Sequence, residues 1–223
     1  MTADISHQEL VQLLKKLRSR RFPPIPPEDM YFEQRRVAQA VGERRKASAS
    51  SNGGVEGPFV PLLYVPGILD RLQALGEHVR FHTGVPPKLR ELAILVTARH
   101  VGAQLEFFVH AIEAREFGLA EDAIDALAAK RLPANLDEDE KTVYDFCSEL
   151  HARGRVSDDT FARAEKRFGK VVILDLIATC GYYATLGMVL NVTQTVLPPE
   201  VVLPFSVPAD LSTPVGFPAS EAE

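Results

Sequence analysis

The feature of this sequence that most constrains its fold is the apolar run VVILDLIATCGYYATLGMVL at residues 171–190. A run of this length can cross a bilayer as a helix. It nevertheless contains Asp175, two threonines and two tyrosines, and an aspartate in mid-bilayer is costly. The run therefore predicts a buried core helix against which other helices pack, and no membrane association.

The rest of the chain also has helical periodicity, interrupted by proline and glycine. The best strand candidates are FVPLLYV at residues 59–65 and EVVLPFSV at 200–207, and proline disfavours both. We therefore predict an all-α fold of about seven to nine helices. The expected organisation is an N-terminal helical extension and flexible loop over residues 1–56, a helical domain over 57–197 and a proline-rich extended tail over 198–223.

Composition and charge narrow the class of protein. The formal net charge of −5 gives no reason to expect nucleic-acid binding. The N-terminus MTADISHQEL lacks the basic and apolar segments of a secretory signal. Cys147 and Cys180 lie in apolar helical patterns and form no CxxC pair, so we expect buried free thiols in a reducing, cytoplasmic setting.

A candidate site lies in ARHVGAQLEFFVHAIEARE, residues 98–116, which is either one helix or is broken near Gly102. On a continuous helix, Arg99, Glu106 and His110 share one side, opposite an apolar side. The solvated face of an amphipathic helix explains this pattern. A site explains it as well, because a cation, a carboxylate and an imidazole are the groups that proton-transfer chemistry uses. Both interpretations stay open at this point.

The longer segment GVPPKLRELAILVTARHVGAQLEFFVHAIEAREFGL resembles the carboxymuconolactone decarboxylase family, within the alkylhydroperoxidase-D-like superfamily. Redox-active members of that superfamily carry a glutamate, then a Cys-x-x-Cys pair, then a histidine at fixed spacing. Here Glu91 and His110 match the glutamate and the histidine, whereas Ala103 and Glu106 stand at the cysteine positions. The chain thus resembles a branch that lacks the redox pair. The resemblance implies an all-helical subunit that assembles into homotrimers or homohexamers, with sites near subunit contacts.

This resemblance and the residue types favour a cofactor-independent lyase or isomerase that acts by acid–base chemistry on a small carboxylated lactone or oxo-acid. His110 is the candidate for proton transfer, and Glu106 would orient it or balance its charge. Glu91, alone in an apolar run, would be a second acid from the preceding helix.

Three further residues are candidates for binding the substrate. Arg99 would hold a substrate carboxylate, and His100 and Gln104 are weaker candidates on another face. We expect no metal and no cofactor, because a histidine flanked by two carboxylates at these spacings is not a recognised ligand set. The alternatives are a non-catalytic or ligand-binding protein on the same scaffold and, less favoured, a peroxide-reducing thiol enzyme.

Overall fold

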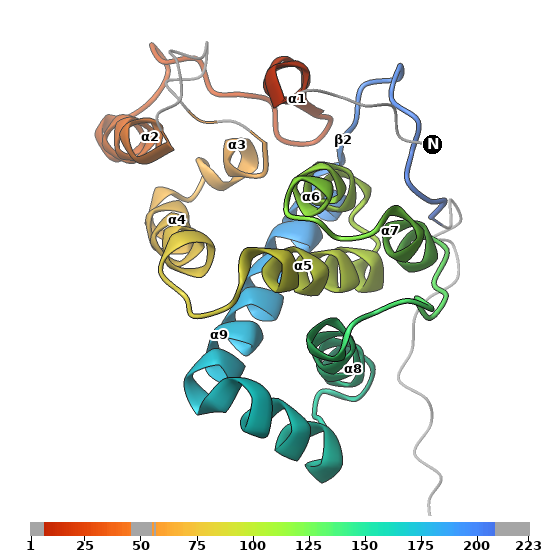
Figure 1. Cartoon of the computed structure of the whole chain (residues 1–223). Helices are drawn as coiled ribbons and strands as arrows, with labels where there is room; N and C mark the ends of the chain where they lie inside the picture. Colours follow the sequence, from red (N-terminus) through yellow and green to blue (C-terminus); the bar gives the residue numbers. More distant parts are fainter. Residues whose placement is uncertain (1–6, 46–54, 56, 208–223) are drawn as a thin grey trace, which may run out of the picture.

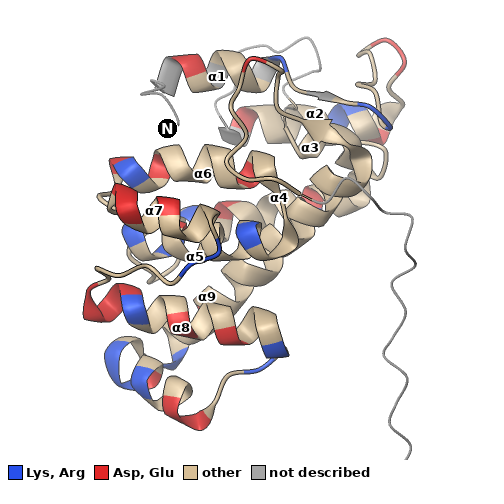
Figure 2. Cartoon of the chain, turned by 90° about the vertical axis from the view of Figure 1, so that its right-hand side faces the viewer, with Lys and Arg blue, Asp and Glu red and all other residues tan. Residues whose placement is uncertain are grey.

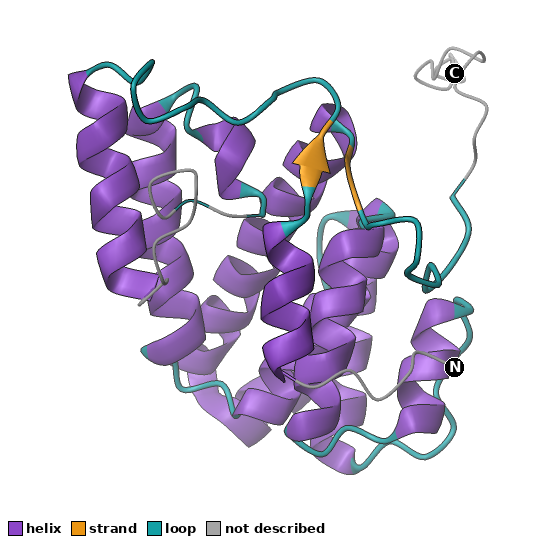
Figure 3. Cartoon of the chain, turned by 90° about the horizontal axis from the view of Figure 1, so that it is seen from above, coloured by secondary structure: helices purple, strands orange, loops and turns teal. Residues whose placement is uncertain are grey.

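The computed structural model describes residues 7–45, 55 and 57–207 and is almost entirely helical (Figure 1). Figure 3 shows the helices in purple and the small strand pair in orange. The predicted all-α fold is confirmed, and the described part contains nine helices, within the predicted number. The elements in chain order are α1 (His7–Lys15), β1 (Arg18–Ser19), α2 (Phe32–Arg45), α3 (Phe59–Leu62), α4 (Pro66–Phe81), α5 (Pro87–Val101), α6 (Gln104–Glu116), α7 (Glu121–Ala128), α8 (Glu138–Arg153), α9 (Asp158–Thr193) and β2 (Thr195–Val196).

Helix α5 forms the centre of the molecule. Every residue from Leu89 to Ala98 is buried, and the helix packs against α6, α8 and α9. Figure 1 shows α5 between α6 and α8, with α9 running behind it. A helix that is covered on all sides can hold a polar side chain only where a partner satisfies it. Glu91 on α5 must therefore have such partners.

Helix α9 is the apolar helix that the sequence predicts, but it is less buried than expected. Among the described helices it alone is long and apolar enough to cross a membrane, and 44% of its apolar window is buried. Leu176 and Leu186 lie in the core, whereas Val171 and Leu174 are 74% and 66% exposed. The helix therefore covers the core with one side and leaves an apolar side uncovered in the single chain.

Local sequence signals explain where the main helices begin and end. Pro87 begins α5 in the first turn, where a backbone N–H has no partner within the helix, so the missing N–H of proline costs nothing. Gly102 ends the helix in the left-handed conformation, with a φ of 71°. Asp137 and Glu140 form a reciprocal capping box at the start of α8. Gly169 interrupts α9 with a φ of 76° and a ψ of 168°, which glycine adopts readily.

The break at Gly102 decides a point that the sequence left open. Residues 98–116 are not one helix, because α5 ends at Val101 and α6 starts at Gln104. The two helices fold back on each other and form the helix pair with the most extensive mutual packing. Arg99 therefore does not share a helix face with Glu106 and His110, as a continuous helix would require.

The N-terminal helices pack onto the rest of the fold. Leu10 of α1, and Leu17 just after this helix, share a hydrophobic cluster with Leu105, Phe108 and Ile112 of α6. Helix α2 packs against α4. Most of the flexible loop predicted at the end of the N-terminal extension, and the tail from residue 208, lie outside the described residues. The described end of the chain, residues 197–207, follows β2 without regular structure.

Neither of the two strand candidates forms a strand, as their prolines indicate. Residues 59–62 form the short helix α3, and residues 200–207 form no strand. The β structure in the described part is instead a two-residue antiparallel ladder, in which Arg18 pairs with Val196 and Ser19 with Thr195. Ser19 also donates a hydrogen bond to the Thr193 carbonyl at 2.7 Å. This ladder ties the N-terminal segment to the end of α9.

Candidate functional site

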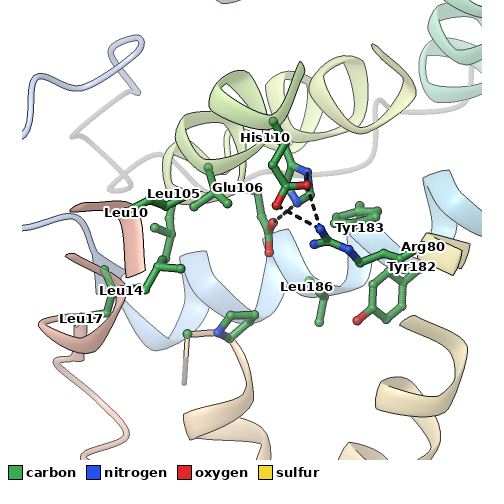
Figure 4. A pocket seen from close by; sticks show the side chains of 14 residues that line it. Leu10, Leu14, Leu17, Arg80, Leu105, Glu106, His110, Tyr182, Tyr183 and Leu186 are labelled. Carbon is green, nitrogen blue, oxygen red and sulfur yellow. Dashed lines mark hydrogen bonds and ion pairs between the residues drawn. The ribbon is translucent and has the colours of Figure 1, made fainter. Parts of the chain in front are cut away.

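A cavity of about 170 Å³ lies between α1, α4, α6 and α9 (Figure 4). One part of its wall is apolar, and the other part carries the charged side chains of the stripe predicted on α6. Figure 4 shows Leu10, Leu14 and Leu17 on one side and Arg80, Tyr182 and Tyr183 on the other. Its lining residues are Leu10, Leu14, Leu17, Gly57, Pro58, Arg80, Leu105, Glu106, Val109, His110, Glu113, Tyr182, Tyr183 and Leu186.

The imidazole of His110 is held by a carboxylate from the neighbouring helix. His110 is 3% exposed and Glu91 is fully buried. The Nδ1 atom of His110 lies 2.6 Å from Oε2 of Glu91, and Arg90 donates from Nε to the other oxygen of Glu91 at 3.2 Å. Arg90 also donates from Nη1 to the Arg80 carbonyl at 2.6 Å. Glu91 therefore fixes the ring of His110 from behind, with both of its own oxygens engaged.

The other edge of the imidazole faces the cavity. Its Nε2 atom lies 3.4 Å from Oε2 of Glu106, one helical turn earlier on α6. Glu113 lies one turn later, with an oxygen 3.8 Å from Nδ1, and Nη2 of Arg80 donates to both oxygens of Glu113 at 3.0 and 2.8 Å. The ring of Tyr183 packs edge-on against the imidazole, with 4.8 Å between the centroids. The site is thus a closed network with Glu106 on its cavity side.

We call this network the imidazole–carboxylate cluster. Its three carboxylates face two guanidinium groups and one imidazole, so the charges balance when the imidazole is protonated. An unbalanced buried charge is costly, so the protein favours the protonated ring. The members of the cluster are Arg80, Arg90, Glu91, Glu106, His110 and Glu113.

The pKa values follow from this balance. Burial alone would lower the pKa of His110, but Glu91, Glu106 and Glu113 outweigh it and raise that pKa to about 10. Burial alone would raise the pKa of Glu91, but His110 and the two arginines outweigh it, so the pKa of Glu91 is lowered. At neutral pH the cluster therefore holds an imidazolium beside an ionised Glu91. Burial raises the pKa of the Tyr183 hydroxyl well above its ordinary value, so it stays neutral.

The structure brings together three of the six predicted site residues. Glu91, Glu106 and His110 lie in one cluster. Arg99 and His100 lie at the opposite end of α5 and line other cavities, one of which Gln104 of α6 also lines. The expectation that Arg99 faces this cluster is wrong. It assumed one continuous helix over residues 98–116, whereas the helix is broken at Gly102.

The arginine that lines this cavity is Arg80, which is not among the site residues predicted from the sequence. Arg80 lies on the last turn of α4, and no motif marks it. Arg90 stands next to Glu91 in the sequence, and that adjacency in an apolar run was the one available signal for a buried ion pair. Glu113 had the correct spacing on α6, but its partner Arg80 comes from another helix.

One subset of the cluster has the geometry of a metal site. Single donor atoms of Glu91, His110 and Glu113 lie within 4.8 Å of one another. These donors are already engaged, since Arg90 bonds Glu91, Arg80 bonds Glu113, and the imidazole Nδ1 bonds Glu91. A divalent cation bound to these oxygens would repel the nearby guanidinium groups, so it would have to displace them. The residues therefore fit an acid–base site better than a metal centre.

The fold and the cluster define a class: an all-helical scaffold in which a glutamate from one helix and a histidine from the next meet beneath a small cavity, without a thiol. Residues 66–153 match the model of the carboxymuconolactone decarboxylase family. The matched segment contains α4 to α8 and all six members of the cluster, and the matching family is the one that the sequence resembles. No curated protein matches the chain.

Proposed function

We propose that the chain is a cofactor-independent enzyme that transfers protons to and from a small carboxylated lactone or oxo-acid. The observation that carries this proposal is the imidazolium of His110, fixed by Glu91 and directed toward a cavity with an apolar wall. An imidazole held in one orientation by a carboxylate is a recurrent arrangement in acid–base catalysis. The family match supports the scaffold and leaves the reaction to be established.

In this proposal His110 is the acid. Decarboxylation breaks the bond between a carboxylate and its neighbouring carbon, releases carbon dioxide and leaves an electron pair that an adjacent carbonyl accepts as an enolate. An imidazolium Nε2–H near that oxygen stabilises the developing negative charge, and its proton can then pass to carbon. Solvent returns the proton to the ring. An imidazole whose pKa is about 10 is protonated at neutral pH, as this role requires.

Glu106 is then the base in any isomerisation step. Within the described residues Glu106 pairs with His110 alone, whereas the other two carboxylates are also held by arginines. It is therefore the carboxylate that is freest to accept a proton from a ligand. Arg80 would bind a carboxylate of the ligand, because its described contacts to Glu113 use only Nη2 and leave other N–H donors.

The test is turnover of a panel of small lactones and oxo-acids that carry a carboxylate, followed by ultraviolet absorbance and carbon dioxide release. His110→Gln should lower the rate by ~10²–10⁴-fold, as loss of acid–base catalysis does. Glu116→Gln is the matched control, because Glu116 is an exposed residue on the same helix. If panel members bind in a manner that depends on His110 and Arg80 but none is turned over, the chain is a ligand-binding protein on the same scaffold.

We also propose that the subunit self-associates, as a trimer or a multiple of it, through the uncovered side of α9. Apolar side chains there recur at helical spacing and are exposed in the single chain. A second copy is the occupant that the resemblance implies. Leu174→Glu should reduce the assembly in sedimentation experiments, whereas Leu132→Glu, at an exposed leucine elsewhere, should not. A monomeric wild-type protein at micromolar concentration would contradict this proposal. The exposed side comprises Val171, Leu174, Ile177, Met188 and Val192.

A further inference from the structure

A second concave region lies where α5 ends. Two cavities of about 600 and 250 Å³ meet there and share Arg99, His100 and Lys130 as lining residues. We call them together the basic cavity. The larger one is also lined by the end of α9, by β2 and by Ser206 and Val207, and the smaller one by α8. The larger cavity alone has the size of a typical small-molecule site.

The charges of the basic cavity are all of one sign. Its lining residues include Arg20, Arg99, Lys130 and Arg131 and contain neither aspartate nor glutamate. None of these four side chains forms an ion pair with a carboxylate of the described residues, although the chain has a net charge of −5. Figure 2 shows acidic and basic residues interspersed along α6 and α8. The basic cavity therefore brings four cations together without a carboxylate among its lining residues.

Arg99 is held in place by contacts that do not neutralise it. Its Nε donates to the Ala128 carbonyl at 2.8 Å, and its guanidinium lies over the ring of Phe205, 4.2 Å from the centroid. Gln104 donates to the Phe205 carbonyl at 2.5 Å and so fixes the segment that carries this ring. A guanidinium that is oriented before a ligand arrives loses less freedom when it binds a phosphate or carboxylate.

His100 is placed among these cations as well. It stacks on His151 with 4.9 Å between the ring centroids. Burial, His151 and Lys130 lower the pKa of His100. Thr97 contacts Nε2 of His151 at 2.8 Å, and no carboxylate of the described residues pairs with either ring. An anion in the cavity would raise the pKa of His100 again and so favour its protonation.

The backbone supplies an independent observation. In the described residues only Lys130 and Gln194, apart from glycines, have a positive φ, at 54° and 53°. Both residues follow a helix end, where glycine would be less strained, and both line the larger cavity. Strained non-glycine residues of this kind concentrate at functional sites. Lys130 and Gln194 therefore line this cavity in a backbone conformation that costs free energy for residues other than glycine.

From these observations we propose that the basic cavity binds a small molecule that carries at least two negative charges, as a phosphoryl group or as a pair of carboxylates. The cations supply the charge, and Asn191, Gln194 and Thr195 supply amide and hydroxyl groups for the body of the ligand. A concave site of this size suits a small molecule and not a polymer. This site is separate from the imidazole–carboxylate cluster, and its occupant need not be a substrate.

The test is calorimetric titration of the full chain with inorganic pyrophosphate and with citrate, at constant ionic strength set with sodium chloride. Wild type should bind at least one of them, and the preferred probe indicates whether phosphoryl or carboxylate groups are recognised. Lys130→Ala and Arg99→Gln should each weaken binding about tenfold, the effect of losing one charge-assisted contact. Lys166→Ala, at an exposed lysine with no ion pair among the described residues, is the matched control.

A second readout locates the ligand and does not depend on variants that could fold poorly. The imidazole signal that disappears from the NMR spectrum in His100→Gln should titrate at higher pH when the anion is bound. Absence of binding of both probes at millimolar concentration would overturn the proposal. Binding that is unchanged in Lys130→Ala, or that leaves the His100 titration unaltered, would overturn it as well.

Discussion

The imidazole–carboxylate cluster and the basic cavity lie on the same helix pair, and Leu105 of α6 lines the cavities at both places. They differ in charge balance. In the cluster, three carboxylates meet two arginines and an imidazolium, and the central groups are buried. In the basic cavity, four cations remain without a carboxylate partner in the described part of the chain, and three of them are exposed. Buried charges must be neutralised by other groups of the protein, whereas charges in an open cavity can be neutralised by a ligand.

The largest expected effect comes from breaking the balance of the cluster. His110→Gln removes the cation of the cluster that contacts all three glutamates, and it leaves Glu91 buried with Arg90 as its remaining charged partner. Removing one member of a buried ion pair typically costs ~3–5 kcal/mol, so urea unfolding should show a loss of that order. Glu116→Gln should stay within about 0.5 kcal/mol of wild type. A loss for His110→Gln as small as that of the control would show that the cluster is not balanced as described.

The pH dependence of stability tests the same balance without a mutation. The pKa of His110 is about 10 in the folded chain and ordinary, near 6.5, when unfolded, so its contribution is complete below pH 6.5 and is lost as the pH rises through 10. The lowered pKa of Glu91 gives a contribution that is complete above its ordinary value and is lost in acid. Unfolding midpoints should therefore fall from pH 6.5 toward pH 10, and less steeply in His110→Gln. Parallel curves for the two proteins would contradict the raised pKa of His110.

Substitution of the two cysteines tests whether these buried thiols contribute to function. Cys147 and Cys180 are free and buried, as predicted, and their sulfur atoms lie 3.6 Å apart between α8 and α9. Neither lines the cavity beside His110. Serine at either position buries a more polar group and should cost ~1–3 kcal/mol of stability, with little change in turnover. Thiol-dependent peroxide turnover that disappears in either serine variant would favour the peroxidase alternative instead.

The sequence predicted the parts of the fold and the site that depend on one helix or on a family pattern. It predicted the helical class, and it singled out Glu91, Glu106 and His110, which the structure brings together. Arg99 was misplaced because a turn of about 100° per residue holds only within one helix. Arg80 could not be found, because its role depends on how the end of α4 meets α6, which is a tertiary contact without a local signature.

The docking of α1 was beyond the sequence for a similar reason. Its leucines have helical spacing, which predicts an amphipathic helix but not the surface that it covers. In the structure Leu10 and Leu17 pack on α6 and form part of the cavity wall above His110. The uncovered side of α9 is the converse case, because the sequence shows an apolar helix without showing which of its sides lacks a partner in the single chain.

The smallest expected effect concerns the backbone conformation of Lys130 in the basic cavity. Lys130 has a φ of 54°, a conformation that costs a residue with a Cβ atom about 1–2 kcal/mol relative to glycine. Glycine gives back about 0.5–1 kcal/mol through the greater freedom of the unfolded chain. Lys130→Gly should therefore be slightly more stable than wild type in urea, by up to about 1.5 kcal/mol, while Lys130→Ala, which keeps the strain, should be nearly neutral. Both variants lose the charge, so they should bind pyrophosphate equally weakly. At about 100 times the wild-type dissociation constant, pyrophosphate should stabilise wild type by ~2.7 kcal/mol and variants that bind about tenfold more weakly by ~1.4 kcal/mol, so wild type should gain about 1.3 kcal/mol relative to both variants. Stability differences between wild type and the two variants that are the same with and without the anion would show that Lys130 is not kept at this strained position for binding.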